Sequence, residues 1–219
     1  MTRTLYSYWR SSAAYRVRIA LAVKGLDYDT RAINLLTGAQ SGVGFTMLNP
    51  QGMVPYLVDG EVGLNQSLAI IEYLDEVYPA PPLLPPDPIG RARVRAAALA
   101  IACDIHPLNN LRVLRYLKDP LGHDQEAVET WQRHWIETGF AALEEIAEAR
   151  ANLGAGAGEY LFGDAVTLAD VCLVPQFANA RRVQADVARF PHLSAIDERL
   201  NALPAFAAAR PDRQPDAVK

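Results

Sequence analysis

The first eighty residues alternate between strand-like and helix-like patterns of apolar and polar positions. Residues 4–8 predict a short strand. Apolar side chains then recur with helical spacing from Ala13 to Leu21, and the hydroxyl of Ser11 or Ser12 is a suitable N-cap for that helix. Residues 29–35 predict a second strand, which should run parallel to the first because a helix connects the two.

A hairpin and a second helix complete this part of the chain. The dipeptide Asp59-Gly60 separates strand-like runs at 54–58 and 61–64, which is a strong signal for a two-residue turn. Ser67 precedes the apolar run 68–74, and we expect it to cap a helix there. The order is βαβ followed by ββα, which is the thioredoxin-like arrangement.

Pro55 stands at the mouth of a strand that should lie inside the sheet, where a residue without an N–H is poorly tolerated. The position makes sense if the Val54-Pro55 peptide bond is cis. The backbone groups of Val54 would then be available to pair with a bound peptide-like ligand.

Beyond this point the pattern becomes helical. Residues 78–88 hold six of the fifteen prolines, so we expect a stiff linker at 81–88 between a domain at 1–80 and a domain at 89–219. Helical patterns cover 91–117 with an interruption near Pro107, then 126–150, 167–177 after a loop with Gly154, Gly156 and Gly158, and 193–210. Thr167 and Asp170 have the spacing of a capping box. The fold class expected is α+β with two domains.

Composition limits the possible functions. The 219 residues are 50% hydrophobic and 21% charged with a formal net charge of −4, which suits a soluble protein with a real core and argues against a nucleic-acid surface. There is no apolar run of the roughly 20 residues that a membrane span needs and no apolar signal segment, so we expect a cytoplasmic location. Cys103 and Cys172 lie far apart in apolar stretches, which favours two buried thiols over a disulfide or a metal site.

Five segments resemble, in collinear order, the zeta class of the soluble glutathione transferases. They are RSSAAYRVRIALAVKGLDY (10–28), LNPQGMVPYL (48–57), NQSLAIIEYLDEVYP (65–79), CDIHPLNNLRVLRYL (103–117) and GDAVTLADVCLVPQFANARR (163–182). The resemblance covers nearly the whole chain. It implies the glutathione transferase fold, with a thioredoxin-like glutathione-binding domain followed by an all-helical substrate-binding domain. One departure is that the Ser-Ser-Cys motif of the class reads Ser11-Ser12-Ala13 here, which puts haloacid side activities in doubt more than the main reaction.

The members of this class are maleylacetoacetate and maleylpyruvate isomerases. The resemblance therefore implies a glutathione-dependent cis–trans isomerase, expected as a homodimer, in which the thiolate adds to the double bond, the bond rotates and glutathione is eliminated. We favour maleylacetoacetate, in tyrosine and aromatic catabolism, because it is the usual substrate of the class. Maleylpyruvate of the gentisate route is the alternative. A general transferase is disfavoured by Ala13 and by two candidate carboxylate-binding arginines. A non-catalytic binding protein is a further alternative, but such a protein need not keep Ser11 or the Gln66-Ser67 pair, and this chain has both.

The resemblance also implies that Ser11, with Ser12 as second choice, stabilises the glutathione thiolate. Lowering a thiol pKa from about 8.5 by ~2 units takes roughly 2.7 kcal/mol. A helix N-terminus supplies about 0.3–2 kcal/mol and a charge-assisted hydrogen bond about 1.5–3, so no general base is required. On the residues alone, both serines could equally be plain helix caps.

The remaining site assignments follow from the same resemblance. Arg10 and Arg182 are expected to grip the substrate carboxylates through paired hydrogen bonds, with Arg181 as a competing neighbour. Glutathione is expected to contact Ser11, Gln40, Val54, Gln66 and Ser67 in the first domain and His106, Asn110 and Arg112 in the second. Arg16 and Arg18 are expected to make salt bridges or to line the domain interface, and Thr167 and Asp170 to be structural.

Overall fold

The computed structural model describes residues 3–152 and 158–218, and the chain divides into two compact units. The first unit joins Met1–Pro82 with Leu203–Lys219, and the second is Leu83–Ala202. The sequence pattern continues the helical domain to residue 219. The structure instead groups the segment after residue 202 with the first unit.

A four-stranded sheet in the order β2-β1-β3-β4 forms the centre of the first unit. Strand β1 (Arg3–Ser7) is parallel to β2 (Asp29–Ala32) and antiparallel to β3 (Tyr56–Asp59), which pairs with β4 (Val62–Asn65) across the Asp59-Gly60 turn. The predicted topology is confirmed. Strand β2 ends three residues before the predicted residue 35, because Asn34 begins a turn in which its side chain accepts from the N–H of Leu36.

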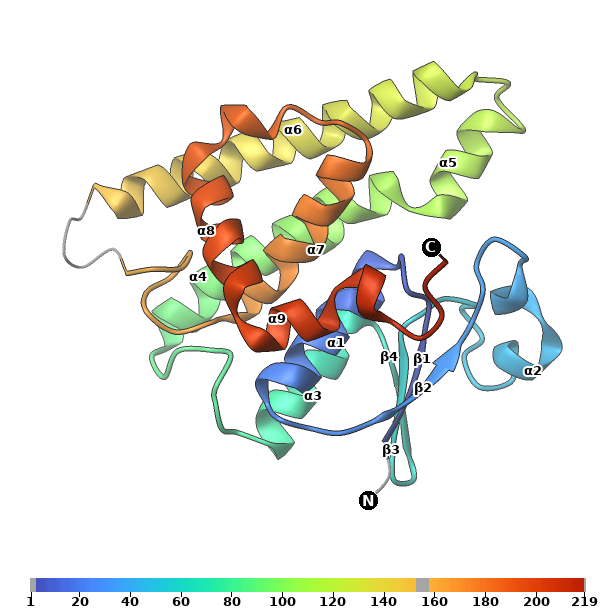
Figure 1. Ribbon diagram of the computed structural model, residues 1–219, viewed down its shortest axis with the longest axis horizontal. Coiled ribbons are helices and arrows are strands. Elements are labelled where there is room, and N and C mark those ends of the chain that lie inside the picture. Colours follow the sequence, from blue (N-terminus) through green and yellow to red (C-terminus); the bar gives the residue numbers. More distant parts are fainter. Residues whose placement is uncertain (1–2, 153–157, 219) are drawn as a thin grey trace. The chain divides into compact units, whose positions relative to one another are not determined.

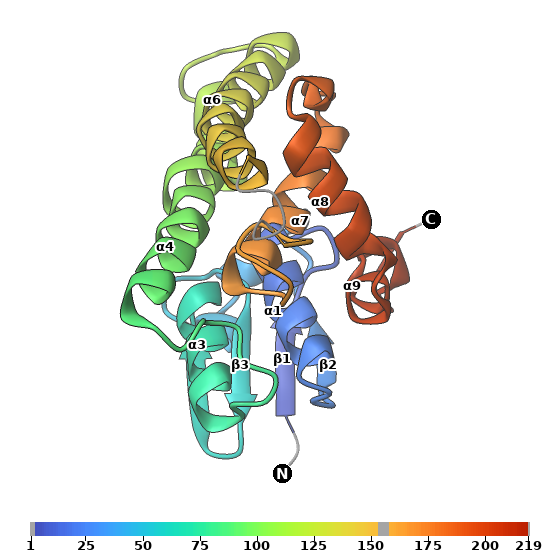
Figure 2. The same ribbon diagram turned by 90° about the vertical axis from the view of Figure 1, so that its left-hand side faces the viewer.

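Helices α1 (Ser12–Val23) and α3 (Ser67–Val77) lie side by side on one face of the sheet (Figure 2). Val17 and Ile70 of these helices are fully buried, as are Leu5 and Leu57 of the two central strands. The 3₁₀ helix η1 (Ala39–Ser41) and the short helix α2 (Val43–Thr46) lie on the other side of the sheet (Figure 1).

A last helix of the first unit comes from the far end of the chain. Helix α9 (Pro204–Ala209) packs against α1 with Phe206 fully buried, and a 3₁₀ turn, η6 (Pro211–Arg213), follows it. The single helix predicted at 193–210 is therefore two helices, because Pro204 cannot continue the preceding one.

The second unit is mainly helical in its described residues, with an isolated β-bridge between Tyr160 and Gly163. Its elements are α4 (Pro88–Leu99), the π-helical segment η2 (Ala100–Ile105), the 3₁₀ segment η3 (His106–Asn109), α5 (Leu111–Lys118), α6 (Gln125–Ala151), α7 (Leu168–Arg182), η5 (Val187–Arg189) and α8 (Pro191–Ala202). The predicted interruption near Pro107 is confirmed, and α7 extends beyond its predicted end. Phe140 of α6 stacks on Phe177 of α7 at 4.7 Å between ring centroids in the core. Gly154 and Gly156 of the predicted loop lie outside the described residues.

The capping box at the start of α7 is confirmed. The Asp170 carboxylate accepts hydrogen bonds from the Thr167 N–H at 2.8 Å, the Thr167 hydroxyl at 2.7 Å and the Leu161 N–H at 3.1 Å. Asp170 is fully buried, and this burial raises its pKa above the ordinary value against the opposing effect of those hydrogen bonds. The box ties the loop before α7 to the helix.

The two cysteines differ in exposure, and neither forms a disulfide. Cys172 is buried in α7 as expected. Cys103 is exposed on η2, so the prediction of a buried thiol is wrong there, because the π-helical turn carries this position to the surface. Over residues 3–152 and 158–218, no helix is both long and apolar enough to cross a membrane.

Candidate active site

Three chain segments meet at one edge of the sheet in the first unit. The register pairs Tyr6 of β1 with Tyr56 of β3, and Tyr56 with Asn65 of β4, so β1 and β4 end where β3 begins. The start of α1, the Val54-Pro55 bond and the start of α3 all adjoin this edge, which we call the site edge. Tyr8 and Val54 share one buried cluster there.

Ser11 is the residue that caps α1. Its backbone is extended, its Oγ accepts a hydrogen bond from the Ala14 N–H at 3.2 Å, and its N–H donates to the Tyr8 carbonyl at 2.9 Å. Ser12 is the first residue within the helix. Capping uses the Ser11 oxygen as an acceptor and leaves the hydroxyl proton able to donate elsewhere. The capping role and the thiolate-stabilising role are therefore compatible in this one side chain.

Arg10 lies beside this cap and is exposed. Its guanidinium lies over the Trp9 indole at 5.4 Å from the ring centroid. Arg10 directly precedes Ser11 in the sequence. Its guanidinium stacks on Trp9 and remains exposed, so an anion can reach it.

Gln66, and not Ser67, is the N-cap residue of α3. Gln66 has φ 65° and ψ 114°, and its side-chain Nε2 donates to Gln51 Oε1 at 2.9 Å. Such a conformation costs a residue other than glycine about 1–3 kcal/mol and occurs most often at functional sites. The predicted cap at Ser67 is wrong because Ser67 already belongs to the helix, and its buried hydroxyl accepts from Arg16 Nη1 at 3.3 Å.

The Val54-Pro55 bond is cis, as predicted. Val54 precedes the first residue of β3, Tyr56, so it is not part of the strand ladder. In the described part of the chain, its N–H and C=O make no hydrogen bond. Val54 itself is buried. Its backbone polar groups therefore remain to be paired by something other than the sheet.

Asn49 organises the loop that leads to Val54, and the sequence reasoning missed it. Its Nδ2 donates to the Met53 carbonyl at 2.7 Å, and its Oδ1 accepts from Asn65 Nδ2 at 3.2 Å and from the Gln51 N–H at 3.3 Å. The side chain is almost fully buried. Its only signal in the sequence was its place in the LNPQGMVPYL segment.

Gln40 lies in η1, close to the same loop. Its backbone carbonyl oxygen is 3.1 Å from where a Cβ would stand on Gly52, so the two backbones are in close approach. The Gln40 Oε1 is buried and accepts no hydrogen bond from residues 3–152 or 158–218. A buried amide oxygen without a donor is costly, and a ligand N–H would satisfy it.

The candidates in the second unit gather around Pro107. Asn110 caps α5 by accepting from the Arg112 N–H at 3.1 Å, Arg112 is exposed in the first turn, and His106 begins η3. The structure brings these three residues to one junction between η3 and α5.

The two arginines at the end of α7 have different partners. Arg181 pairs with the buried carboxylate of Asp197, and this cation opposes the effect of burial, which raises the Asp197 pKa. Arg182 donates from Nη2 to the neutral amide oxygen of Asn179. Arg181 is therefore engaged with a buried carboxylate of the chain itself.

Comparison with family models agrees with this arrangement. The model of the glutathione S-transferase N-terminal domain matches residues 1–76, and that of the C-terminal domain matches residues 126–208. The chain has the fold of a glutathione S-transferase.

Individual relatives define the class more closely. The chain is 55% identical to a probable maleylacetoacetate isomerase of Vibrio cholerae over 99% of both chains, and 46% identical to a maleylpyruvate isomerase of a Ralstonia species over 98% of this chain and 99% of that one. It matches the holo structure of a maleylpyruvate isomerase, described as a bacterial zeta-class glutathione S-transferase, with a TM-score of 0.94 and 45% identity over 98% of this chain and 100% of that one. It also matches a maleylacetoacetate isomerase from Methylobacterium extorquens AM1, solved with bound malonate and GSH, with a TM-score of 0.92 and 41% identity over 99% and 100% of the two chains. The chain belongs to the zeta class of the glutathione S-transferase family.

Proposed function

We propose that this protein is a glutathione-dependent cis–trans isomerase that converts maleylacetoacetate to fumarylacetoacetate. The observation that carries the proposal is the Ser11 cap, whose hydroxyl proton is not used in capping and which adjoins the same sheet edge as Val54 and Gln66. The 55% identity over 99% of a probable maleylacetoacetate isomerase supports the choice of reaction.

The residues at the site edge fit glutathione. The backbone groups of Val54, which make no hydrogen bond within residues 3–152 and 158–218, suit the cysteinyl backbone of a tripeptide, and the start of α3 at Gln66 and Ser67 suits its γ-glutamyl carboxylate. The buried Gln40 Oε1 offers an acceptor for a ligand N–H. When bound, glutathione supplies a sulfur nucleophile that adds reversibly to a conjugated double bond and so allows the bond to rotate.

Ser11 makes that sulfur anionic near neutral pH in this proposal. Its hydroxyl donates a hydrogen bond to the thiolate, and the positive end of α1 adds its electrostatic effect. These two contributions total about 2–5 kcal/mol, against the roughly 2.7 kcal/mol that a two-unit pKa shift requires. Ser12 is the second choice for the donor.

Two guanidinium groups bind the substrate carboxylates. Arg10 is exposed next to the Ser11 cap, and Arg182 is the α7 arginine that is not engaged with Asp197. His106, Asn110 and Arg112 are proposed to complete the ligand contacts from the second unit. Malonate, a dicarboxylate, and citrate, a tricarboxylate, are bound in maleylacetoacetate isomerase relatives, which supports an anion-binding role for such a site.

We further propose a homodimer that works in the cytoplasm in tyrosine or aromatic catabolism. Val43 and Met47 of the α2 region are 76% and 80% exposed, and an apolar surface of this kind is suited to contact with a second copy. No nucleic-acid or membrane partner is included in the proposal.

The second candidate is maleylpyruvate isomerase, favoured by the TM-score of 0.94 to one such enzyme. A steady-state comparison of the two substrates, each with and without glutathione, separates the candidates. We expect a higher kcat/KM for maleylacetoacetate and no turnover without glutathione. A higher value for maleylpyruvate would select the second candidate, and no turnover of either would favour a binding protein.

A further inference from the structure

The loop at residues 8–11, which we call the Ser11 loop, is held by side chains from distant parts of the chain. Within the loop, the Ser11 N–H donates a hydrogen bond to the Tyr8 carbonyl and so forms a turn. One turn of this kind does not fix the direction in which the next side chain projects. The cap bond from the Ala14 N–H fixes the Ser11 oxygen relative to α1, and the contacts that hold Trp9 fix the Ser11 loop relative to the rest of the first unit.

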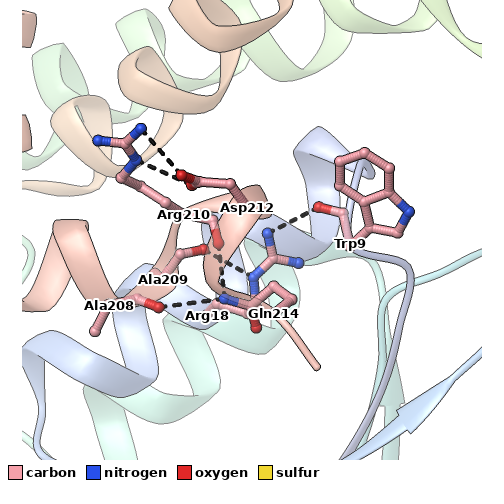
Figure 3. Close-up of polar contacts among 7 residues, drawn as sticks. All are labelled: Trp9, Arg18, Ala208, Ala209, Arg210, Asp212 and Gln214. Carbon is pink, nitrogen blue, oxygen red and sulfur yellow. Dashed lines mark hydrogen bonds and ion pairs between the residues drawn. The ribbon is translucent and has the colours of Figure 1, made fainter. Parts of the chain in front are cut away.

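Arg18 holds the carbonyl side of Trp9. Its guanidinium is almost fully buried and donates to three groups, Trp9 O at 3.2 Å, Ser7 Oγ at 3.2 Å and Ala209 O at 3.0 Å. Figure 3 shows Arg18 lying between Trp9 and the last turn of α9. Burial lowers its pKa to about 10, which leaves it charged at neutral pH. Arg18 thus joins the end of β1, the Ser11 loop and α9.

Asp216 holds the amide side of Trp9. Its Oδ2 accepts from the Trp9 N–H at 2.9 Å, across 207 positions of sequence. Its other oxygen, Oδ1, is buried and accepts nothing from the described residues. Asp216→Ala would therefore remove the hydrogen bond to Trp9 together with the charge interaction between Asp216 and Arg18.

The segment that carries Asp216 is itself folded against α9. Gln214 Nε2 donates to the carbonyls of Ala208 at 3.2 Å and Arg210 at 2.8 Å, and Arg210 forms an ion pair with Asp212 (Figure 3). The Ala217 N–H then donates to the Gln214 carbonyl. The Gln214 and Ala217 bonds bring Asp216 back to the Ser11 loop, and the Arg210–Asp212 pair lies exposed outside them.

We infer that Asp216 and Arg18 are positioning residues for Ser11, and that the segment 210–218 clamps the Ser11 loop so that the hydroxyl faces the thiolate. The inference rests on the proposed isomerase function for its catalytic consequence, but not for the clamp itself. Both backbone groups of Trp9, two residues before Ser11, are bound by side chains that contact or follow α9. A displacement of about 1 Å in a catalytic group can cost a hundredfold in rate, so fixing this loop has kinetic value.

Substitutions at Asp216 test the clamp, because the position is only partly buried and lies after the last helix. Asp216→Ala removes the acceptor. Asp216→Asn keeps one oxygen that can accept from the Trp9 N–H and removes the charge. Asp212→Ala, which removes an exposed carboxylate of the same segment, is the matched control.

The first measurement is amide hydrogen exchange over residues 8–14 in the protein without ligands, which is independent of any activity. We expect faster exchange in Asp216→Ala than in the wild type, Asp216→Asn or Asp212→Ala. Unchanged exchange in Asp216→Ala, or equal acceleration in Asp216→Asn, would overturn the hydrogen-bonded clamp.

The second measurement is the pH dependence of kcat and KM with glutathione and maleylacetoacetate. We expect Asp216→Ala to lower kcat about tenfold to a hundredfold and to move the pH profile to higher pH, with KM for glutathione changed little. Asp216→Asn should recover most of kcat. Faster exchange with unchanged kcat and pH profile would overturn the positioning role, whereas a wild type inactive on both substrates would instead contradict the proposed function and leave the exchange result standing.

Discussion

Ser11 combines two roles that are usually weighed against each other, a helix cap and a catalytic donor. Its oxygen accepts from Ala14 while its proton can point elsewhere. The sequence could place this serine at the start of the helix but could not say which of Ser11 and Ser12 is the cap. The structure distinguishes them, because only Ser11 has the extended backbone of an N-cap.

We predict that Ser11→Ala raises the pKa of the enzyme-bound glutathione thiol by about 1–2 units, because a charge-assisted hydrogen bond of about 1.5–3 kcal/mol is lost. The loss in kcat near neutral pH should be roughly 10²–10³-fold, as for removal of one donor to a developing anion. Ultraviolet titration of the bound thiolate and steady-state kinetics measure these effects. Ser12→Ala is the control, and an equal shift in both variants would contradict the assignment to Ser11.

The adjacent arginines of α7 allow a matched comparison. Arg182→Ala is expected to raise KM for the dicarboxylate substrate about tenfold or more. Arg181→Ala should leave KM alone and cost about 2 kcal/mol of stability, because the carboxylate of Asp197 stays buried without its cation. The reverse pattern would show that Arg181 binds substrate.

At the scale of elements, the starts of helices carry most of the polar organisation. The capping box of Thr167 and Asp170 was predictable, because both partners lie within four residues and the spacing is diagnostic. The network around Asn49 was not, because it links Asn49 to Asn65 across the hairpin and has no local pattern. The cap at Gln66 was missed because its positive φ is imposed by tertiary structure and not by its side chain.

We predict that Asp170→Asn destabilises the protein by about 3 kcal/mol. The Asp170 carboxylate accepts hydrogen bonds from the N–H groups of Leu161 and Thr167. In the asparagine variant an NH₂ group would face one of these N–H donors, which would then lose its acceptor. Urea unfolding at pH 7 measures the loss, with Glu198→Gln on the exposed side of α8 as the control. A loss below about 0.5 kcal/mol would contradict a structural role for the box.

The pH dependence of the same variant follows from the raised pKa of Asp170. A carboxyl whose pKa is higher in the folded state binds its proton more tightly there. Its contribution to the free energy of unfolding is therefore complete at pH values below the unfolded-state pKa near 3.9, and it is lost as pH rises through the folded-state pKa. The stability difference between wild type and Asp170→Asn should therefore be larger near pH 4 than at pH 7. A difference that grows with pH would mean that the hydrogen bonds outweigh burial.

At the scale of the molecule, the sequence predicted the βαβ-ββα order, the hairpin and the helical second half because each rests on local periodicity. It could not predict that residues 203–218 belong with the first unit. That grouping depends on the packing of α9 on α1 and on contacts such as Asp216 to Trp9, which no local pattern reports. For the same reason, the sequence indicated that Arg18 makes a salt bridge or lines the domain interface and could not predict its three bonds to neutral oxygens.

Phe206 tests this division of the chain. Phe206→Ala should cost about 3–5 kcal/mol, because a fully buried aromatic ring of α9 is replaced by a cavity. Hydrogen exchange should accelerate in α1 and much less in α6 and α8, with Phe206→Leu intermediate. Acceleration confined to the second unit would contradict the placement of α9.

The late position of α9 has a consequence for the order of folding during synthesis. A ribosome completes the strands and helices of residues 3–82 well before it makes α9, and the intervening 120 residues of the second unit, Leu83–Ala202, take about 6–24 seconds at ordinary elongation rates. Throughout that interval, Arg18 has no Ala209 carbonyl to bind and Trp9 has no Asp216. The nascent first half therefore waits with an unfinished surface on α1 until the last residues of the chain have been made.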